Sequence, residues 1–570
     1  MIGRWRKKSE DAEVSSEPIV VEGYAKGAGG RARSRIRMTM LVFFTVYAVI
    51  GGRLVWLGNQ ELESTGPGPS RVTTSRPDIV DRNGEVLATD INTASLYAEP
   101  RRIVDADEAL EKLLTVLPDL NIEQTYNRLK SNAGFIWLRR QLSPSQQQAI
   151  MQLGIPGIGF RTEKRRFYPG GPTAAHIVGL VNIDNKGIAG MEKFIDDQGL
   201  SDLQEAGLAL PKDLEPVRLS IDLRVQHIVR DELEQAMERY KAIAAGAVVL
   251  NARTGEVLAM ASVPDFDPNN PYNAHEKDRL NRMSAGVYEM GSTFKGFTVA
   301  MALDAGTANL NSRFDATRPI QIGRHTIRDF HGKNRVLTVP EVFIYSSNIG
   351  TARMAETVSI DHHREFFHRL GLLDRMETEL PEVARPTEPS VWKRIHQITI
   401  SFGHGVATTP LQTAVAAAAL VNGGKLIQPT FLPRTEDETA AVAKQVINPK
   451  TSDMMRYLYR QNVEVGSGKR AEVPGYFVGG KTGTAEKVVN GRYSSNKRFN
   501  AFVGAFPVND PDYIVLAVLD EPQPEKPGVG ATAGLNTTVM VGNIIRRSAT
   551  LLGVKPDFGH ESNALLVSSH

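Results

Sequence analysis

The chain of 570 residues contains no cysteine. Disulfides, zinc sites with thiolate ligands and a cysteine nucleophile are therefore excluded, and the sequence is compatible with any redox compartment. A large excess of charge of one sign is also absent, because 67 basic and 64 acidic residues leave a formal net charge of +3. The overall charge gives no indication of a nucleic-acid partner. No group of His, Asp and Glu has the spacing of a metal site, so we expect neither a metal nor a cofactor.

One long apolar segment lies near the N-terminus, from Met38 to Leu57. Twenty helical residues rise about 30 Å, the thickness of the hydrocarbon core of a bilayer. The arginines before the segment fit the positive-inside rule, and no small-residue cleavage site of a signal peptide follows it. We therefore predict a cytoplasmic segment at 1–37, one uncleaved transmembrane helix at 38–57 and a polar linker at 58–76. All later residues are then expected outside the cytoplasm.

Two folded domains are expected after the linker, because the chain is too long for one ordinary domain. The first, at 77–212, opens with a hairpin whose turn is Asp81 to Gly84, and its basic run 164–166 predicts a solvated strand face. The second, at 213–550, has two early and three late strand-like runs with helical sequence between them. This pattern predicts an α+β fold with an antiparallel sheet covered by helices. Residues 551–570 are expected to form a disordered tail.

The stretch GYFVGGKT, Gly475 to Thr482, fits the nucleotide-binding pattern G-x-x-x-x-G-K-[ST]. A P-loop needs a flexible loop followed by a helix whose N-terminus faces phosphate. Here the loop positions hold aromatic and β-branched residues that favour a strand, and Gly483, a short strand and the turn Asn490-Gly491 follow. Asp520, at the end of a later apolar run, is expected to cap a turn rather than bind magnesium. We therefore predict no nucleotide, and an edge strand that presents Lys-Thr-Gly to a cleft.

Ser292 and Lys295 stand three residues apart at the start of an apolar stretch. On a helix this spacing places both side chains on one face, so that the lysine amine can approach the hydroxyl. A serine becomes a good nucleophile when a neighbour takes its proton, and a lysine can do this when burial or a second cation lowers its pKa. The apolar stretch GFTVAMAL after Lys295 predicts that the start of this helix is buried.

The S-x-x-K pattern is weak alone, and Ser494 with Lys497 matches it by chance in a polar hairpin. Ser292 gains weight from an ordered set of three motifs that is typical of penicillin-binding proteins and class A β-lactamases. The set is S-x-x-K at Ser292 and Lys295, S-S-N at Ser346, Ser347 and Asn348, and K-T-G at Lys481, Thr482 and Gly483.

With these motifs the sequence resembles the class B penicillin-binding proteins, which are membrane-anchored peptidoglycan D,D-transpeptidases. Three further stretches carry the resemblance, which covers nearly the whole chain after Arg31: RPDIVDRNGEVLATDI at 76–91, KRRFYPGG and the residues that follow at 164–196, and SFGHGVATTPLQ and the residues that follow at 401–424. The cell-division members are the most similar, with elongation-specific relatives as the alternative.

The resemblance implies an elongated non-catalytic pedestal, or dimerisation, domain at 77–212. It also implies a transpeptidase domain of the serine β-lactamase type at 213–550. The protein would be anchored in the bacterial inner membrane with a periplasmic catalytic domain. Its partners would be stem pentapeptides, acceptor stem amines, an FtsW-type glycosyltransferase and other division proteins, and β-lactams would inhibit it covalently.

The resemblance also implies catalytic roles. Ser292 would attack the carbonyl of the penultimate D-alanine in a donor stem, with Lys295 as the base. Ser346 would relay a proton toward the leaving amine, and Asn348 would hold Lys295 and the substrate amide. The amine of a second stem would then resolve the ester and form the crosslink.

Substrate binding is expected along the strand that carries Lys481, Thr482, Gly483 and Thr484. Lys481 and Thr482 would receive the terminal carboxylate of the donor. The backbone N–H groups of Ser292 and Thr484 would form the oxyanion hole.

Two other function classes share these motifs. A D,D-carboxypeptidase or β-lactamase would use water as the acceptor, but the length, the predicted anchor and the large first domain argue against it. A non-enzymatic sensor or scaffold acylated by β-lactams is the second alternative. His404, between two glycines in SFGHGV, is expected to serve a structural loop rather than catalysis.

Overall fold

The computed structural model describes residues 38, 40–52, 75–199, 214–323, 325–489 and 492–558. The chain divides into two compact units, Met1–Val72 and Thr73–His570. In the first unit, residues 40–52 are helical, and their apolar side chains are largely exposed. No helix within the described ranges is both long enough and apolar enough to span a bilayer. Of the predicted N-terminal segments, residues 1–37, 39 and 53–74 lie outside the described ones.

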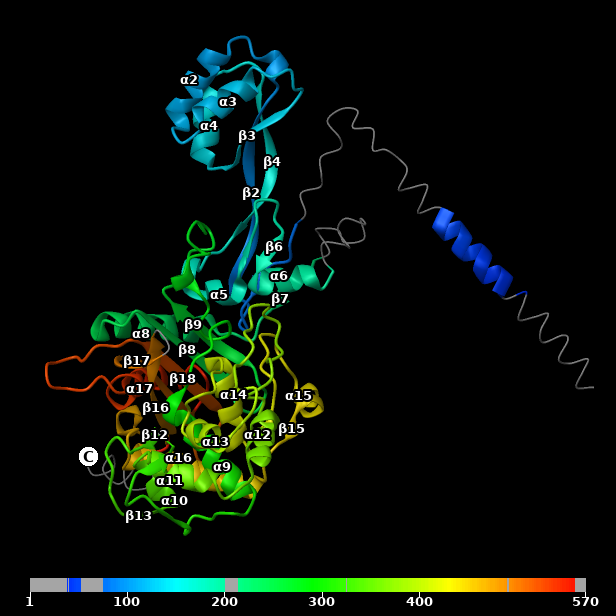
Figure 1. The fold of residues 1–570 in the computed structure, drawn as a ribbon. Helices are drawn as coiled ribbons and strands as arrows, with labels where there is room; N and C mark the ends of the chain where they lie inside the picture. The colour runs from blue at the N-terminus through cyan, green and yellow to red at the C-terminus, as the bar shows by residue number, and fades with distance from the viewer. Residues whose placement is uncertain are drawn as a thin grey trace, which may run out of the picture. The chain divides into compact units, whose positions relative to one another are not determined.

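The second unit begins with a five-stranded sheet in the order β3-β2-β1-β7, with β4 paired to β2 (Figure 1). The predicted hairpin is confirmed, since β1 and β2 are antiparallel and Asp81 Oδ1 accepts hydrogen bonds from the N–H groups of Asn83 and Glu85. The strands are β1 (Ile79–Val80), β2 (Val86–Ala98), β3 (Ile136–Leu142), β4 (Ile158–Phe167) and β7 (Val217–Arg218).

Three helices pack on the outer part of this sheet through two small apolar clusters, one around Leu96 and Leu113 and one around Ala98 and Leu129. They are α2 (Ala106–Val116), α3 (Ile122–Leu129) and α4 (Pro144–Gln152). Short elements continue the chain: η1 (Pro100–Arg102), η2 (Gly171–Ala174), α5 (Ala175–Val178), β5 (Leu180–Val181), β6 (Gly187–Ala189) and α6 (Gly190–Asp197).

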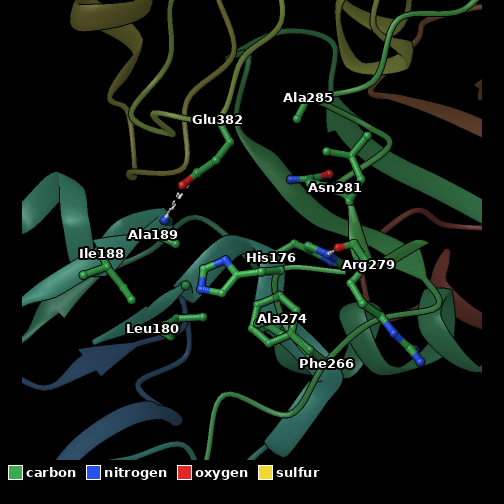
Figure 2. Close-up of a pocket in the computed structure, with 15 residues that line it drawn as sticks. His176, Leu180, Ile188, Ala189, Phe266, Ala274, Arg279, Asn281, Ala285 and Glu382 are labelled. Atoms are coloured by element: carbon green, nitrogen blue, oxygen red, sulfur yellow. Dashed lines mark hydrogen bonds between the residues drawn. The ribbon is translucent and has the colours of Figure 1, made fainter. Parts of the chain in front are cut away.

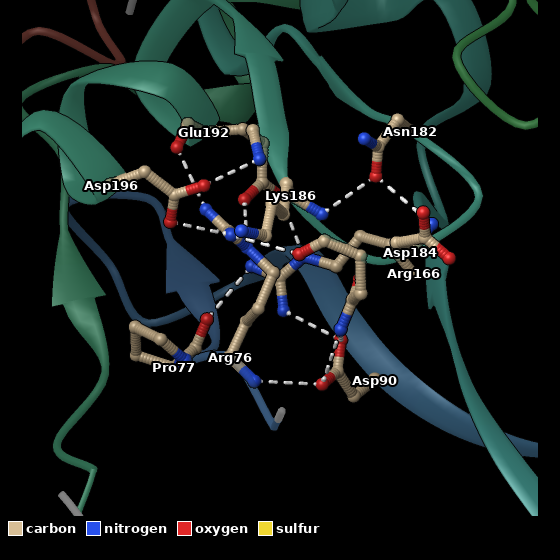
Figure 3. A network of polar contacts seen from close by, with 11 residues as sticks. Arg76, Pro77, Asp90, Arg166, Asn182, Asp184, Lys186, Glu192 and Asp196 are labelled. Atoms are coloured by element: carbon tan, nitrogen blue, oxygen red, sulfur yellow. Dashed lines mark hydrogen bonds and ion pairs between the residues drawn. The ribbon is translucent and has the colours of Figure 1, made fainter. Parts of the chain in front are cut away.

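A buried ion network at the base of this sheet corrects the prediction for the basic run 164–166 (Figure 3). Arg166 is 3% exposed and donates from Nε to Glu192 Oε1 at 2.6 Å. Arg76 donates from Nε to the other oxygen, Oε2, at 2.7 Å. The prediction is therefore wrong for Arg166, which turns inward to neutralise a carboxylate that is itself fully buried, while Lys164 and Arg165 are half-buried.

This first part of the unit meets the later part at a cavity of about 290 Å³ (Figure 2). At its edge the N–H group of Gly190 donates to both carboxylate oxygens of Glu382, at 3.2 and 3.3 Å. His176 contributes a second link, because its Nε2 lies 2.7 Å from the backbone oxygen of Arg279. Since a carbonyl oxygen can only accept, His176 Nε2 carries the proton.

The later part contains a second five-stranded sheet, in the order β16-β17-β18-β8-β9, with every neighbouring pair antiparallel. The early pair of strands and the late three thus join as the sequence predicts. Their bounds are β8 (Ala244–Asn251), β9 (Val257–Val263), β16 (Gly479–Val489), β17 (Arg492–Phe506) and β18 (Tyr513–Asp520).

Helices cover both faces of this sheet, as predicted (Figure 1). Strand β18 is buried on both sides: Leu516 packs into one core, and Ala517 packs into the core on the opposite face. Helices α8 (Leu223–Tyr240) and α17 (Thr537–Ser548) contribute to the second core.

The first core is larger and holds most of the helices between the early and late strands. In order they are α9 (Lys295–Asp304), α10 (Val339–Ile344), α11 (Asn348–Ala355), α12 (Ile360–Arg369), α13 (Arg394–Ser401), α14 (Pro410–Val421), α15 (Glu436–Val442) and α16 (Pro449–Glu464). Four short 3₁₀ segments and three two-stranded sheets lie among them and in the later part: η4 (Lys277–Arg279), η5 (Gly291–Phe294), η6 (Lys469–Ala471), η7 (Ala533–Leu535), β10 (Arg313–Asp315) with β13 (Val336–Thr338), β11 (Ile320–Ile322) with β12 (His325–Ile327), and β14 (Lys425–Leu426) with β15 (Lys444–Gln445).

The predicted disordered tail, 551–570, begins too early. Val554 is buried in the core beneath α17, and the N–H group of Asp557 donates to the backbone oxygen of Gly475 at 2.8 Å. The apolar side chains of this segment bury enough surface to hold it against the domain. Residues 559–570 lie outside the described ones.

Candidate active site

Ser292 lies in the 3₁₀ turn η5, and Lys295 is the first residue of α9. In a 3₁₀ turn, side chains three residues apart eclipse one another, so the pair shares a face as the spacing predicts, although no single α-helix carries both. The residues from Lys295 to Leu303 are all buried. Lys295 itself is 1% exposed, as expected for the start of a core helix.

The ammonium group of Lys295 contacts the second motif. Its Nζ donates to the hydroxyl of Ser346 at 3.0 Å and to the backbone oxygen of the same residue. Ser346 has a backbone φ of +55°, a strained value for a residue with a side chain. This conformation lets one residue present both its carbonyl and its hydroxyl to Lys295. Among the described residues, the Ser292 hydroxyl makes no hydrogen bond, so it is available to a ligand.

Lys481 approaches the same hydroxyl from the sheet. Its Nζ lies 3.1 Å from Ser346 Oγ and 3.2 Å from the backbone oxygen of Thr482. Lys481 is 0% exposed, and its ammonium lies over the ring of Phe343. The side chain therefore passes beneath the floor of the site, while Thr482 and Thr484 face the open side.

Burial lowers the pKa of both lysines. The pKa of Lys295 falls well below its ordinary value because the side chain is desolvated and because Lys481 lies nearby, and only Asp329 opposes the shift. The pKa of Lys481 falls to about 7 through burial. The site thus holds two amines that can lose a proton at a pH where an exposed lysine cannot.

Gly483 allows the strand of the third motif to pack closely against the turn that carries Ser292. A Cβ atom at this position would lie 2.4 Å from the backbone oxygen of Met290 and 2.8 Å from Cγ2 of Thr293. The strand can approach the turn that carries Ser292 only because residue 483 has no side chain. Strand β16 is at the edge of the sheet, as predicted for the Lys-Thr-Gly strand.

The P-loop pattern has no structural counterpart. Residues 479–489 form β16, which pairs antiparallel with β17, so a strand follows the lysine where a P-loop requires a helix. Asp520 ends β18 and accepts from Lys487 Nζ at 2.7 Å. Its carboxylate therefore forms an ion pair with a strand residue.

The remaining residues of the second motif have local partners. Ser347 caps α11, where its Oγ accepts from the N–H group of Gly350, and it donates to Asp329 Oδ2 at 2.7 Å. Asn348 donates from Nδ2 to the backbone oxygen of Arg328 at 2.9 Å. Within the described residues no hydrogen bond joins Asn348 to Lys295. The structure thus does not bring Asn348 to Lys295 as the resemblance implies, because its amide turns toward the loop at 328–331.

A cavity of about 510 Å³ opens over these motifs. Five of the eight predicted site residues line it: Ser292, Ser346, Asn348, Thr482 and Thr484. Most of the other lining residues were not predicted, because they lie outside the three motifs, most of them in loops and two, Glu486 and Arg498, on strands β16 and β17. They include Arg328, Asp329, Phe330, His331, Tyr345, Phe402, Ser467, Glu486, Arg498 and Thr532. Ser467 is one example, since its Oγ lies 2.7 Å from Thr482 Oγ1 and so orients that hydroxyl.

His404 also lines this cavity, although its sequence context predicts a role in a structural loop. Its Nδ1 lies 3.0 Å from Oε2 of Glu289, three residues before Ser292. The signal that could have identified it is the pair of flanking glycines, because Gly403 and Gly405 both have φ near +90°. Among the described residues, no group of three or more His, Asp and Glu is arranged to hold a metal.

Comparison with known proteins shows to which family the sequence is similar. The penicillin-binding protein transpeptidase domain matches residues 245–541, and the penicillin-binding protein dimerisation domain matches residues 71–202. The chain belongs to the class B penicillin-binding proteins. All eight predicted site residues of this penicillin-binding protein fall within the matched transpeptidase range.

Several full-length relatives are similar to this penicillin-binding protein. A probable peptidoglycan D,D-transpeptidase FtsI from Caulobacter vibrioides is 39% identical over 92% of this chain and 89% of its own length. The probable peptidoglycan D,D-transpeptidase PenA of Neisseria meningitidis is 35% identical over 85% of each chain. The peptidoglycan D,D-transpeptidase FtsI of Escherichia coli is 30% identical, also over 85% of each chain.

Proposed function

We propose that this penicillin-binding protein is a peptidoglycan D,D-transpeptidase that crosslinks stem peptides through an acyl-enzyme on Ser292. The observation that carries the proposal is the position of Ser292 in a cavity whose floor holds two buried lysines around one serine hydroxyl. The names of the relatives support the same activity. β-Lactams would acylate the same serine.

In the proposed reaction Ser292 attacks the carbonyl of the penultimate D-alanine in the donor stem. Lys295 receives the proton of the hydroxyl, a step favoured by its lowered pKa. Ser346, which is hydrogen-bonded to Lys295 Nζ, then relays a proton to the leaving D-alanine. The amine of a second stem attacks the ester, and the C–N bond forms as the bond to Ser292 breaks.

The open side of β16 would bind the donor. Thr482 and Thr484 line the cavity and offer hydroxyls to the terminal carboxylate. The buried ammonium of Lys481, which is hydrogen-bonded to Ser346 and to the backbone oxygen of Thr482, adds a positive charge beneath this position. The backbone N–H groups of Ser292 and Thr484 would stabilise the oxyanion, since an edge strand leaves N–H groups without a strand partner. Asn348 would contact the amide of the donor stem.

Covalent labelling by a fluorescent penicillin tests the proposal. The Ser292→Ala protein should not be labelled, whereas Ser494→Ala, which alters the chance S-x-x-K match on β17, should be labelled like the wild-type protein. Labelling of Ser292→Ala at the wild-type rate would refute the assignment of the nucleophile.

We also propose that the protein acts in cell division, is anchored in the inner membrane by residues 38–57 and places 77–212 and 213–550 outside the cytoplasm. The similarity to the FtsI proteins favours division over elongation. The arginines before the apolar segment favour this orientation.

The anchor segment is proposed to contact an FtsW-type glycosyltransferase. Gly51 and Gly52 have no atom within 4 Å of the position that a Cβ would occupy, so their surface is open to close approach by another helix. The test exchanges the segment for an unrelated apolar helix of equal length and orientation. Loss of septal crosslinking with penicillin binding retained supports the contact, and normal division of the cells refutes it.

A further inference from the structure

His404 and Glu289 form a fixed pair at the edge of the cavity. Glu289 Oε2 lies 3.0 Å from His404 Nδ1, and Glu289 Oε1 accepts from the N–H group of Gly405 at 2.8 Å and from Tyr493 OH at 3.2 Å. Burial and the nearby Glu289 raise the pKa of Tyr493, so the phenol keeps its proton and donates it. With both oxygens of Glu289 acting as acceptors, His404 Nδ1 carries the imidazole proton and Nε2 carries the lone pair.

The loop that carries His404 is locked to the turn that carries the nucleophile. A Cβ atom on Gly403 would lie 1.9 Å from the backbone oxygen of Gly291, the residue before Ser292. The two backbones therefore touch, and a glycine is required at the contact. Because Glu289 lies only two residues before this turn, the position of His404 relative to Ser292 is set by a backbone contact and by a hydrogen-bonded side chain.

Within the described residues, Nε2 of His404 has no hydrogen-bond partner. The side chain is 26% exposed and lines the cavity that also holds Ser292. Lys295 and Ser346, which the proposed acylation uses, are hydrogen-bonded to each other. The rim thus carries an oriented imidazole that the acylation chemistry does not use.

The second half of the proposed reaction needs such a group. An alkyl amine with a pKa near 10 arrives at neutral pH mostly as an ammonium ion, which has no lone pair with which to attack an ester. Lys295 is occupied with the proton that passes between Ser292 and the leaving groups. A histidine held by a carboxylate is the usual arrangement of a general base.

We propose that His404, oriented by Glu289, takes the proton of the acceptor ammonium, an inference that rests on the function proposed above. One N–H proton passes to His404 Nε2, and the amine nitrogen attacks the ester carbonyl. The C–N bond forms, the bond from carbon to Ser292 Oγ breaks, and the second N–H proton returns to Ser292 through Ser346 and Lys295. His404 releases its proton to water, so the step yields an amide, a free serine and one proton.

The experiment separates acylation from transfer in the full-length protein. His404→Gln is compared with the wild-type protein in two assays: the rate of acylation by benzylpenicillin, and the rate at which an acyl-enzyme formed from a D-alanine thioester donor is captured by added D-alanine. We expect acylation within about threefold of wild type and capture reduced by about 10² or more, the contribution typical of a general base. Glu289→Gln should reduce capture by a smaller factor.

His368→Gln is the matched control. His368 Nδ1 also lies 3.0 Å from a carboxylate, that of Asp374, but this pair is exposed and is not among the residues of the cavity. Both rates should be unchanged in this variant.

A second acceptor distinguishes proton removal from simple binding. An amine whose pKa is near 7 arrives largely unprotonated, so the deficit of His404→Gln should shrink by about tenfold or more with it. The proposal would be overturned if His404→Gln captured the acceptor at the wild-type rate, or if its acylation rate fell as much as its capture rate. It would also be overturned if the loss of capture were the same with both amines. Failure of the Ser292 assignment would be seen separately, as penicillin labelling that survives Ser292→Ala.

Discussion

The hydroxyl oxygen of Ser346 lies between two ammonium groups, 3.0 Å from Nζ of Lys295 and 3.1 Å from Nζ of Lys481. A hydroxyl has two acceptor lone pairs and one proton, so it can accept from both amines or donate to one that has lost its proton. Two buried cations so close to one atom oppose each other, and this favours loss of a proton from one of them. Ser346 is therefore placed to transfer protons between the lysines and a ligand.

Replacement of Ser346 by alanine should slow acylation by penicillin by about 10² or more, because both lysines lose their shared partner. The fold should be retained, since the side chain lies at the cavity and not in the core. The measurement is the second-order rate of covalent labelling, together with the melting temperature.

Ser347→Ala is the adjacent control. Ser347 caps α11 and bonds Asp329, so its loss should cost about 1 kcal/mol of stability while acylation stays within about tenfold of wild type. If Ser347→Ala impaired acylation as strongly as Ser346→Ala, the effect would arise from the loop and not from the hydroxyl between the lysines.

The lowered pKa of Lys481 predicts a pH dependence of stability. The folded protein releases this proton near pH 7 and the unfolded chain near pH 10.5, so between these values the unfolded state binds more protons. Stability contributed by this group therefore rises from pH 7 to 10.5, and burial of the charged form is a cost below pH 7. Lys481→Met removes that cost.

The melting temperatures of Lys481→Met and wild type should therefore be compared at several pH values from 6 to about 10. The difference in favour of the methionine variant should be largest at the acidic end and should decrease toward pH 10. A difference that does not change with pH would show that Lys481 stays protonated in the folded protein throughout this range, as an exposed lysine does.

Gly483→Ala tests the contact between the third motif and the nucleophile turn. The added methyl group would lie 2.4 Å from the backbone oxygen of Met290, so the strand or the turn must move. We expect a loss of about 1–3 kcal/mol of stability and a clear fall in acylation. Gly134→Ala is the control, because a Cβ there has no atom within 4 Å. Normal acylation by Gly483→Ala would mean that the turn tolerates displacement.

The parts of this structure that depend on short sequence patterns could be predicted from the sequence. Strand-like apolar runs separated by turns predicted the five antiparallel strands, and the three motifs predicted which segments meet at the cavity. Contacts between residues that are distant in the sequence could not be predicted in this way. The inward turn of Arg166 depends on Glu192, 26 residues later, and the position of His404 depends on Glu289, 115 residues earlier. A local pattern cannot show such partners, because tertiary packing decides them.

The direction of the Lys481 side chain is a similar case. An exposed cation on an edge strand is what the sequence suggests for carboxylate binding, but the alternation of the strand turns Lys481 inward toward Ser346 and Phe343. Which face of a strand is buried follows from the register with its neighbour, and no residue within the K-T-G motif specifies that register.

The last prediction concerns the buried ion network around Glu192 (Figure 3). Each carboxylate oxygen of Glu192 receives one guanidinium, from Arg76 at 2.7 Å and from Arg166 at 2.6 Å. Glu192→Gln keeps the size of the side chain but removes the charge, so among the described residues the two buried cations keep only Asp196 and Asp90 as ion-pair partners. We expect a loss of about 3 kcal/mol in the free energy of unfolding, as for other broken buried pairs.

Glu108→Gln provides the comparison for this network, since Glu108 pairs with Lys112 on the exposed face of α2 at 2.7 Å. That pair should contribute about 0.5 kcal/mol or less. Denaturant unfolding of both variants measures the difference, and the penicillin acylation rate at low temperature should stay at the wild-type value in each, because Ser292 lies in the other part of the unit. Similar small losses in the two variants would show that the Glu192 network gains as little from its charges as an ion pair in water.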